Sequence, residues 1–288
     1  MQVGIGLPGT MPGVKGELIL DWAKLAEGGP FSSLSVLDWL VYPNYEPLIT
    51  LAAVAGVTQR KRLVTTVLVA PLRNTAILAK QAASIDALSN GRLTLGLGIG
   101  GREDDFLAAQ VPFHERGKRF DEQLATMERI WSGQSLSEKV GAIGPAPVQQ
   151  GGPELLIGGY SPEAIKRISR WGNGFISDGS RDPEAARQGY SVAEQAWKKA
   201  GRPGKPRFVA ATYYGLGPDA AEKAAQYIRH YYAFRGPMAD RIASSVPSTP
   251  DAVKGAIRAY SDLGVDELIL WPTIPDLNQV ELLAELIA

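Results

Sequence analysis

The segment LVTTVLVAPLRNTAILAKQAASIDALSNGRLTLGLGIGG, residues 63–101, decides how this sequence folds. It contains two short runs of mainly β-branched and other apolar residues, Leu63–Val69 and Leu93–Ile99. Between them, Thr75–Ser89 reads as an amphipathic helix. Because both runs are almost continuously apolar, they are typical of parallel strands that are covered on both faces. The segment therefore predicts a strand–helix–strand unit.

The same kind of run recurs along all 288 residues. The first four runs begin near residues 3, 34, 63 and 93, and a repeat of about 30 residues is the length of one strand-plus-helix unit. Eight such units in a chain of this size predict an α/β fold, the (β/α)8 TIM barrel, with residues 1–288 forming a single domain. An open doubly wound sheet is the alternative. The eight predicted strands are Val3–Leu7, Leu34–Asp38, Leu63–Val69, Leu93–Ile99, Glu154–Gly158, Gly174–Asp178, Arg207–Tyr213 and Glu267–Trp271.

The segments between these runs carry signals for helix starts. Ser161-Pro162 places a capping hydroxyl before a proline in the first turn, and Asp182-Pro183 and Thr249-Pro250 repeat the pattern. One connection is longer: Ser132–Pro153, rich in Gly, Pro, Ser and Gln, predicts an inserted loop or hairpin between the fourth and fifth strands. Other predicted helices are Glu17–Glu27, Pro47–Gln59, Lys118–Trp131 and Asp219–Phe234, the last being part of a double helical stretch between the seventh and eighth strands.

The composition excludes several classes of function. Thirty basic and thirty acidic residues give a net charge of zero, so we expect no nucleic acid and no anionic membrane as a partner. The absence of cysteine, with only two histidines, His114 and His230, excludes thiolate chemistry and a histidine-rich metal centre, and no metal site is predicted. No apolar run reaches the roughly 18 residues of a membrane span, and the N-terminus lacks a signal-peptide pattern. We therefore expect a soluble, cytoplasmic protein.

The glycine-rich stretch Gly96-Leu97-Gly98-Ile99-Gly100-Gly101 matches the G-x-G-x-x-G pattern of dinucleotide-binding proteins. In such proteins the loop follows the first strand, and an acidic residue closes the second strand. Here the loop follows the fourth predicted strand, and Asp121, 20 residues on, lies in a predicted helix. An NAD(P)-dependent dehydrogenase of the Rossmann type is thus an alternative, but the glycine-rich stretch and the acidic residue do not lie where that fold requires them. In a barrel, Gly98 and Gly100 would let the backbone approach a ligand where barrel active sites form.

A second glycine-containing stretch, Gly158-Gly159-Tyr160-Ser161, opens a predicted helix. A helix N-terminus offers N–H donors and the positive end of the helix dipole, so it suits an anion such as a phosphate group. The other interpretation is a helix cap that binds only water.

Asp38 and Trp39 follow at the C-terminal end of the second strand, on the functional side of a barrel. An indole there can wall a flat aromatic ligand, and an acid can orient one, although both would also serve as ordinary core and capping residues. Arg102 and His114, after the fourth strand, are further candidates for contact with a substrate. His114 lies in a polar linker and can equally be an exposed histidine.

The chain resembles the bacterial luciferase-like monooxygenase family, the flavin- and deazaflavin-dependent barrel oxidoreductases. The clearest similarity is the stretch from Leu88 to Gly98, which resembles the family's "lS-x-GR-x-x-lGlG" segment. Val111-Pro112-Phe113 and Ile130-Trp131-Ser132-Gly133 follow in the family's order. Pro153 with Ile157–Pro162 is similar to the segment after the family's fifth strand. The resemblance covers nearly the whole chain.

This resemblance implies FMN or the deazaflavin coenzyme F420 at the C-terminal mouth of the barrel. The ring would lie near Asp38, Thr66, Val67 and Leu68, with a non-proline cis peptide among the last three residues. Gly158, Gly159 and Ser161 would receive the phosphate, with Tyr160 and the glycines Gly98 and Gly100 nearby. A homodimer is implied, as are a small-molecule substrate and a flavin reductase partner, and NADPH is considered as an electron source.

Two positions depart from the family pattern. Many relatives have a histidine where this chain has Trp39, and some sugar-phosphate dehydrogenases have a glutamate where it has Gly101. Both usual proton-handling groups are therefore missing. We predict an oxidoreductase or monooxygenase in which reduced FMN or F420 passes a hydride, or activated oxygen, to a small organic substrate, with Asp38 and Trp39 at the reacting centre. A non-catalytic flavin-binding protein is the alternative that the missing histidine permits.

Overall fold

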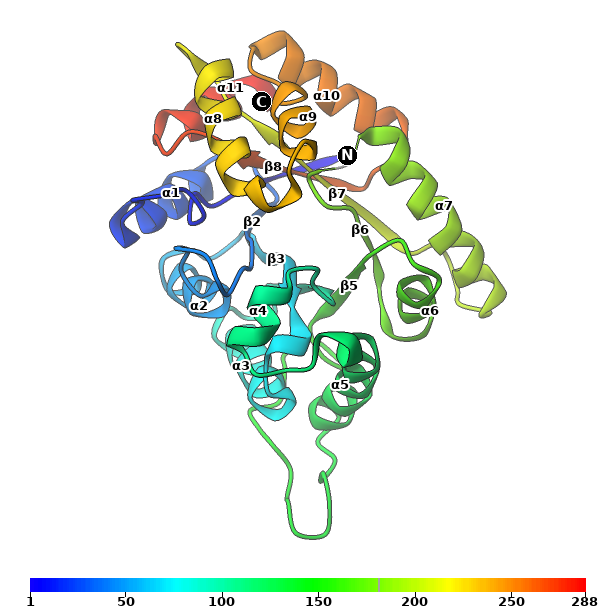
Figure 1. The fold of residues 1–288 in the computed structure, drawn as a ribbon. Helices are drawn as coiled ribbons and strands as arrows, with labels where there is room; N and C mark the ends of the chain where they lie inside the picture. The colour runs from blue at the N-terminus through cyan, green and yellow to red at the C-terminus, as the bar shows by residue number, and fades with distance from the viewer. Residues whose placement is uncertain (181) are drawn as a thin grey trace.

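The computed structural model describes residues 1–180 and 182–288. Its strands form one closed barrel in the order β1 to β8, and every neighbouring pair is parallel (Figure 1). The predicted TIM barrel is confirmed. The open sheet is wrong, because β1 pairs with β8 as well as with β2 and leaves no sheet edge. The strands are β1 (Gln2–Gly6), β2 (Ser33–Val36), β3 (Arg62–Val69), β4 (Leu93–Gly98), β5 (Glu154–Gly158), β6 (Gly174–Ile176), β7 (Arg207–Tyr214) and β8 (Glu267–Pro272).

Helices surround the barrel, and the three predicted cap residues begin theirs. The side chains of Ser161, Asp182 and Thr249 accept the N–H of the residue three positions on, as N-caps do. The segment predicted as one helix up to Phe234 ends at Tyr231 and continues as a short 3-10 turn before Gly236, where φ is +56°. The helices are α1 (Gly16–Gly28), α2 (Pro47–Val57), α3 (Thr75–Leu88), α4 (Glu103–Ala108), α5 (Arg116–Trp131), α6 (Pro162–Trp171), α7 (Pro183–Lys199), α8 (Ala220–Tyr231), α9 (Met238–Ser244), α10 (Pro250–Asp262) and α11 (Asn278–Ile287), with 3-10 turns η1 (Ala70–Leu72), η2 (Phe113–Glu115) and η3 (Ala233–Arg235).

The strands divide their apolar residues between two cores. In β8, Leu268 and Leu270 belong to the core between strands and helices, whereas Ile269 and Trp271 belong to a second core with residues such as Val209. Because successive residues of a strand point to opposite faces, this second core fills the inside of the barrel. The near-continuous apolar runs of the sequence thus serve two cores at once.

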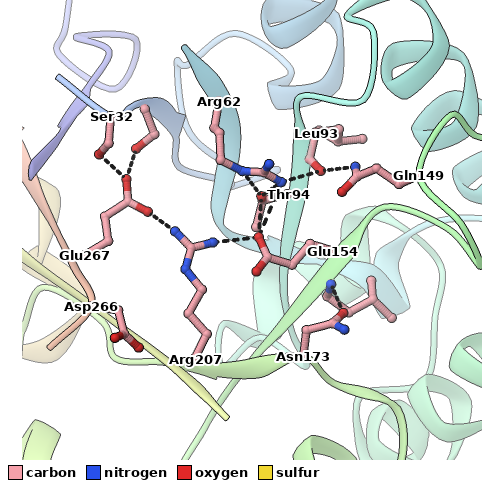
Figure 2. Close-up of polar contacts among 12 residues, drawn as sticks. Ser32, Arg62, Leu93, Thr94, Gln149, Glu154, Asn173, Arg207, Asp266 and Glu267 are labelled. Carbon is pink, nitrogen blue, oxygen red and sulfur yellow. Dashed lines mark hydrogen bonds and ion pairs between the residues drawn. The ribbon is translucent and has the colours of Figure 1, made fainter. Parts of the chain in front are cut away.

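The N-terminal ends of the strands hold a chain of charged side chains, which Figure 2 shows. Arg207 on β7 pairs with Glu267 on β8, and its other terminal nitrogen lies 2.6 Å from Glu154 on β5. Glu154 also accepts from Thr94 at 2.8 Å and lies 3.4 Å from Arg62. Alternating charges therefore join strands β3, β5, β7 and β8 at this end of the barrel.

Glu267 is only 1% exposed, and neighbouring residues satisfy its carboxylate. Ser32 and Ser33 each donate to its Oε1 atom at 2.5 Å, from the start of β2. Gly4 on β1, which lies between these strands, makes room for the contact: a Cβ there would lie 2.2 Å from the Ser33 hydroxyl. One carboxylate thereby links β8 to β2 across β1.

The predicted insertion joins α5 to β5 and projects away from the barrel at the bottom of Figure 1. Within residues 132–153, which are all described, the only strand pairing is a single bridge between Ser137 and Val140, so the segment is a loop. Its return is held by Asp86, whose carboxylate accepts from the N–H groups of Val148 and Gln149. Because α5 runs back toward the N-terminal ends of the strands, the insertion lies at the end of the barrel that holds the charged chain.

Among the described residues, no helix is both long enough and apolar enough to cross a membrane.

Replacing Arg207 by alanine should lower the free energy of unfolding by about 3 kcal/mol, because it leaves the buried Glu267 carboxylate without its cation. Urea denaturation followed by circular dichroism measures this change. Arg229→Ala is the matched control, since the Arg229–Asp240 pair is exposed, with side chains 58% and 68% accessible. It should cost less than about 1 kcal/mol, and an equal loss in both variants would contradict the assignment.

Candidate active site

A cavity of about 240 Å³ opens at the C-terminal ends of the barrel strands. We call it the mouth cavity. Residues of the segment that follows β2, of strands β3 to β8 and of the segment around α8 and η3 surround it. Its lining consists of Leu37, Asp38, Trp39, Thr66, Val67, Val69, Gly98, Ile99, Gly100, Gly101, Gly158, Gly159, Ile176, Asp178, Gly179, Tyr213, Tyr231, Tyr232, Arg235 and Trp271.

Val67 packs between two glycines at the edge of this cavity. The peptide bond between Thr66 and Val67 is cis, as expected from the resemblance, and the pairing of β3 with β4 shifts register here. A Cβ on Gly98 would lie 2.8 Å from one methyl group of Val67, and a Cβ on Gly158 would lie 3.2 Å from the other. The two strands therefore need glycine at these positions to accommodate an apolar side chain between them.

Asp38 is buried, and both of its carboxylate oxygens are engaged. The Arg73 guanidinium binds them with two contacts, at 2.6 and 3.0 Å, and the backbone N–H of Val69 donates to Oδ2 at 2.8 Å. Burial works against the charge of Arg73, but the carboxylates of Asp38 and Glu46 leave the pKa of its guanidinium above the usual value. The geometry makes Asp38 a residue that fixes the ends of β2 and β3 relative to each other.

Trp39 lines the cavity and carries several contacts at its rim. Its indole N–H donates to the Tyr231 hydroxyl, and its ring meets the edge of Phe234 at 5.3 Å. The Arg102 guanidinium lies over both rings, 5.1 Å from each centroid, and donates to the carbonyl of Val41. Arg102 thus joins the loops after β2 and β4 to η3.

The start of α6 lies beside the cavity. Gly159 has φ +122°, and a Cβ on it would lie 2.9 Å from the Ala164 side chain. Ser161 accepts from the N–H of Ala164 at 3.2 Å, and the Tyr160 hydroxyl bonds the Ser177 hydroxyl at 2.7 Å. This turn combines a glycine in a conformation that other residues rarely adopt with the positive end of a ten-residue helix.

The structure brings together eight of the site residues predicted from the sequence. Asp38, Trp39, Thr66, Val67, Gly98, Gly100, Gly158 and Gly159 line the mouth cavity. Five others do not line it. Leu68 belongs to the core between strands and helices, because it points outward where its neighbour points inward. Arg102 lies at the rim, and Tyr160 and Ser161 lie at the start of α6. His114 lies in η2, with its ring against Phe113, and is exposed at the surface.

Sequence reasoning missed the aromatic half of the cavity. Tyr213 and Trp271 close β7 and β8 at the C-terminal end, a position that could have identified them. Tyr231 ends α8 and Tyr232 follows it, and only the fold brings them to the cavity. Burial raises the pKa values of Tyr213, Tyr231 and Tyr232 above that of ordinary tyrosine, so all three hydroxyls stay protonated at neutral pH.

The fold and the cavity define a class: a (β/α)8 barrel with its ligand site at the C-terminal ends of the strands, where enzymes of this fold carry their active sites. Residues 4–280 match the family model described as luciferase-like monooxygenase. The chain therefore belongs to the luciferase-like monooxygenase family, which supports an enzyme of the oxidoreductase or monooxygenase type. The Rossmann-type dehydrogenase is wrong, because the glycine-rich stretch follows β4 of a closed barrel.

Several known proteins are similar to this chain. An uncharacterized protein of Mycobacterium tuberculosis is 29% identical over 209 residues, which cover 62% of this chain and 71% of that protein. The phthiodiolone/phenolphthiodiolone dimycocerosates ketoreductase of Mycobacterium bovis is 32% identical over 167 residues, covering 52% of this chain and 44% of the ketoreductase.

Solved structures share the fold over nearly the whole chain. A monooxygenase from Streptomyces bottropensis has a TM-score of 0.78 at 22% identity, covering 99% of this chain and 98% of its own. An F420-dependent secondary alcohol dehydrogenase, solved with an F420-acetone adduct, has a TM-score of 0.82 at 17% identity with the same coverage.

Asp38→Asn should lower the free energy of unfolding by about 2 kcal/mol, because charge-assisted hydrogen bonds to the buried Arg73 are weakened. Glu46→Gln should cost less, since Glu46 contacts only one nitrogen of Arg73. Chemical denaturation of both variants measures the difference. If Asp38→Asn unfolded with the same free energy as the wild type, the pairing of Asp38 with Arg73 would not contribute to stability.

Proposed function

We propose that this protein is an oxidoreductase that binds reduced FMN or reduced coenzyme F420 in the mouth cavity and acts there on a small organic substrate. The observation that carries the proposal is the cavity itself: glycines and two valines on β3, β4 and β5 lie opposite aromatic side chains. Family membership and the F420-dependent and monooxygenase structures with the same fold support it.

The residues present fit a flavin or deazaflavin. Gly98 and Gly158 let Val67 pack between them, and together they give the cavity an apolar side against which a flat ring could lie. Trp39 supplies an aromatic wall. The start of α6, with Gly159 and Ser161, offers N–H groups and a positive dipole end to the phosphate that both cofactors carry.

The bound cofactor supplies hydride or oxygen chemistry, and the protein supplies binding and orientation. Val67 and Trp39 hold the ring, Asp38 with Arg73 keeps the ends of β2 and β3 in register, and the α6 N-terminus holds the phosphate. Among the described residues, the loops after β4 and the segment around η3 lie close enough to contact the substrate. A cytoplasmic homodimer, served by a flavin reductase if FMN is the cofactor, completes the proposal. NADPH has no support from the comparisons.

Ser161→Asp should weaken FMN or F420 binding roughly tenfold or more, because it places a negative charge beside the phosphate. Aspartate is itself a good N-cap, so α6 keeps its start. Anaerobic titration with FMN and F420, and with riboflavin and the deazaflavin that lacks the phosphate, measures the effect. The phosphate-free compounds should bind both proteins equally.

Thr249→Asp is the matched control, because it makes the same kind of change at the N-cap of α10. It should leave all four affinities unchanged. If Ser161→Asp bound FMN and F420 as tightly as the wild type does, the phosphate would not bind at the N-terminus of α6. Binding of neither cofactor below millimolar concentration by the wild type would refute the proposed function.

A further inference from the structure

Trp271, which lines the mouth cavity, carries a polar donor without a partner among the described residues. The indole nitrogen of Trp271 is buried, in a residue only 2% exposed, and bonds no acceptor among the described residues. The edge of the ring that carries Cε3 and Cζ3 lies over Gly6, where a Cβ would come within 2.2 Å of it. The edge that carries Nε1 therefore faces away from β1. A buried N–H without an acceptor is costly, so a ligand oxygen is its natural partner.

A second donor lies on the neighbouring strand. The hydroxyls of Tyr213 and Tyr232 are 2.8 Å apart, in residues 3% and 5% exposed, and both residues line the same cavity as Trp271. One hydroxyl hydrogen is used between the two oxygens. The other has no acceptor among the residues that the structure describes. The pair can thus donate one hydrogen bond, or one proton, to a bound molecule.

The two charged side chains near the pair, Asp178 and Arg235, both contact Ser180. Asp178 accepts from the backbone N–H of Ser180 at 2.9 Å and from its hydroxyl. Arg235 donates to the Ser180 hydroxyl at 3.0 Å and lies against the Tyr232 ring. On α8, Tyr227 bonds Thr10 and Tyr231 accepts from Trp39. The two donors named above, the Trp271 N–H and the second O–H of the tyrosine pair, are neutral groups, which suit an uncharged oxygen acceptor.

We propose that Trp271 and the Tyr213–Tyr232 pair bind the oxygen of a carbonyl substrate and that the pair is the proton donor of its reduction. This rests on the proposed function. The carbonyl carbon accepts a hydride from the reduced cofactor, the π bond of the carbonyl breaks, and its oxygen takes a proton from the pair. The products are an alcohol and the oxidised cofactor, and the tyrosine pair regains its proton from water. The tyrosines thus take the role of the histidine and glutamate for which this chain has Trp39 and Gly101.

The donor set is tested first without any cofactor. The probe is cyclohexanone, and the control is methylenecyclohexane, which has the same shape with a CH₂ group in place of the oxygen. In a ¹⁵N–¹H spectrum of the whole protein, cyclohexanone should shift the indole resonance that Trp271→Phe removes, and methylenecyclohexane should not. Equal shifts with both compounds, or no shift with either, would overturn the assignment.

The proton donor is tested with cyclohexanone and a panel of small ketones and aldehydes, using whichever reduced cofactor the protein binds. Tyr232→Phe and Tyr213→Phe should each lower kcat about 100-fold or more, with cofactor affinity unchanged and a smaller change in KM. Tyr227→Phe is the matched control, a buried tyrosine of the same cluster whose hydroxyl bonds Thr10, and it should keep wild-type kcat. An equal loss in all three variants, or turnover of no carbonyl by a protein that binds its cofactor, would refute the proposal.

The pH profile gives an independent readout. Burial raises the pKa of both tyrosines; Asp178 acts in the same direction on Tyr232, and Arg235 acts against it. Both hydroxyls therefore stay protonated as pH rises from 6 through 9, and kcat should stay level over about this range. A histidine acid would lose its proton near its usual pKa of about 6.5. A fall in kcat above about that pH would contradict the tyrosine pair.

Discussion

The contact between Glu267 and its partners on three sides is the constraint on which the barrel depends. The carboxylate bonds Ser33 across the side-chain-free Gly4, and it pairs with Arg207, which also holds Glu154. A barrel closes only if its last strand meets its first in one register, and a slip of one residue would turn each side chain to the other face. Here a slip would also leave the buried Glu267 carboxylate without its partners. The free-energy cost of a wrong register is therefore electrostatic as well as hydrophobic.

The interior is organised in layers above this charged end. Val64, Leu156, Val209 and Ile269 form a dry middle layer in which every side chain is at most 1% exposed. Trp271 lies two residues after Ile269 on β8, and Tyr213 lies four residues after Val209 on β7; both line the cavity. The polar groups of the site thus rest on a packed apolar layer that separates them from the charges below. Such a floor holds side chains in fixed rotamers, which a site for directed hydrogen bonds requires.

The sequence allowed the fold, the order of the strands and half of the cavity to be predicted, because these depend on local signals. Continuous apolar runs, a repeat near 30 residues and glycines after strands are all visible in one dimension. The aromatic half was missed for a different reason. Tyr231 ends α8 and Tyr232 follows it, where their spacing is that of any buried helix face, and only the fold of the segment between β7 and β8 carries them to the mouth cavity. The ion pair between Asp38 and Arg73 could not be predicted either. The two residues follow different strands, and no local sequence pattern indicates that they meet.

The insertion of residues 132–153 lies at the opposite end of the barrel from the mouth cavity, and Asp86 holds its return. Barrel proteins separate the face that carries chemistry from the face that carries stability, and this loop lies on the second, where Gln149 donates to the Leu93 carbonyl at the start of β4. Its residues are absent from the lining of the mouth cavity. For the protein engineer, it is a natural attachment point for a fluorophore, an affinity tag or a surface linker that leaves the ligand cavity open.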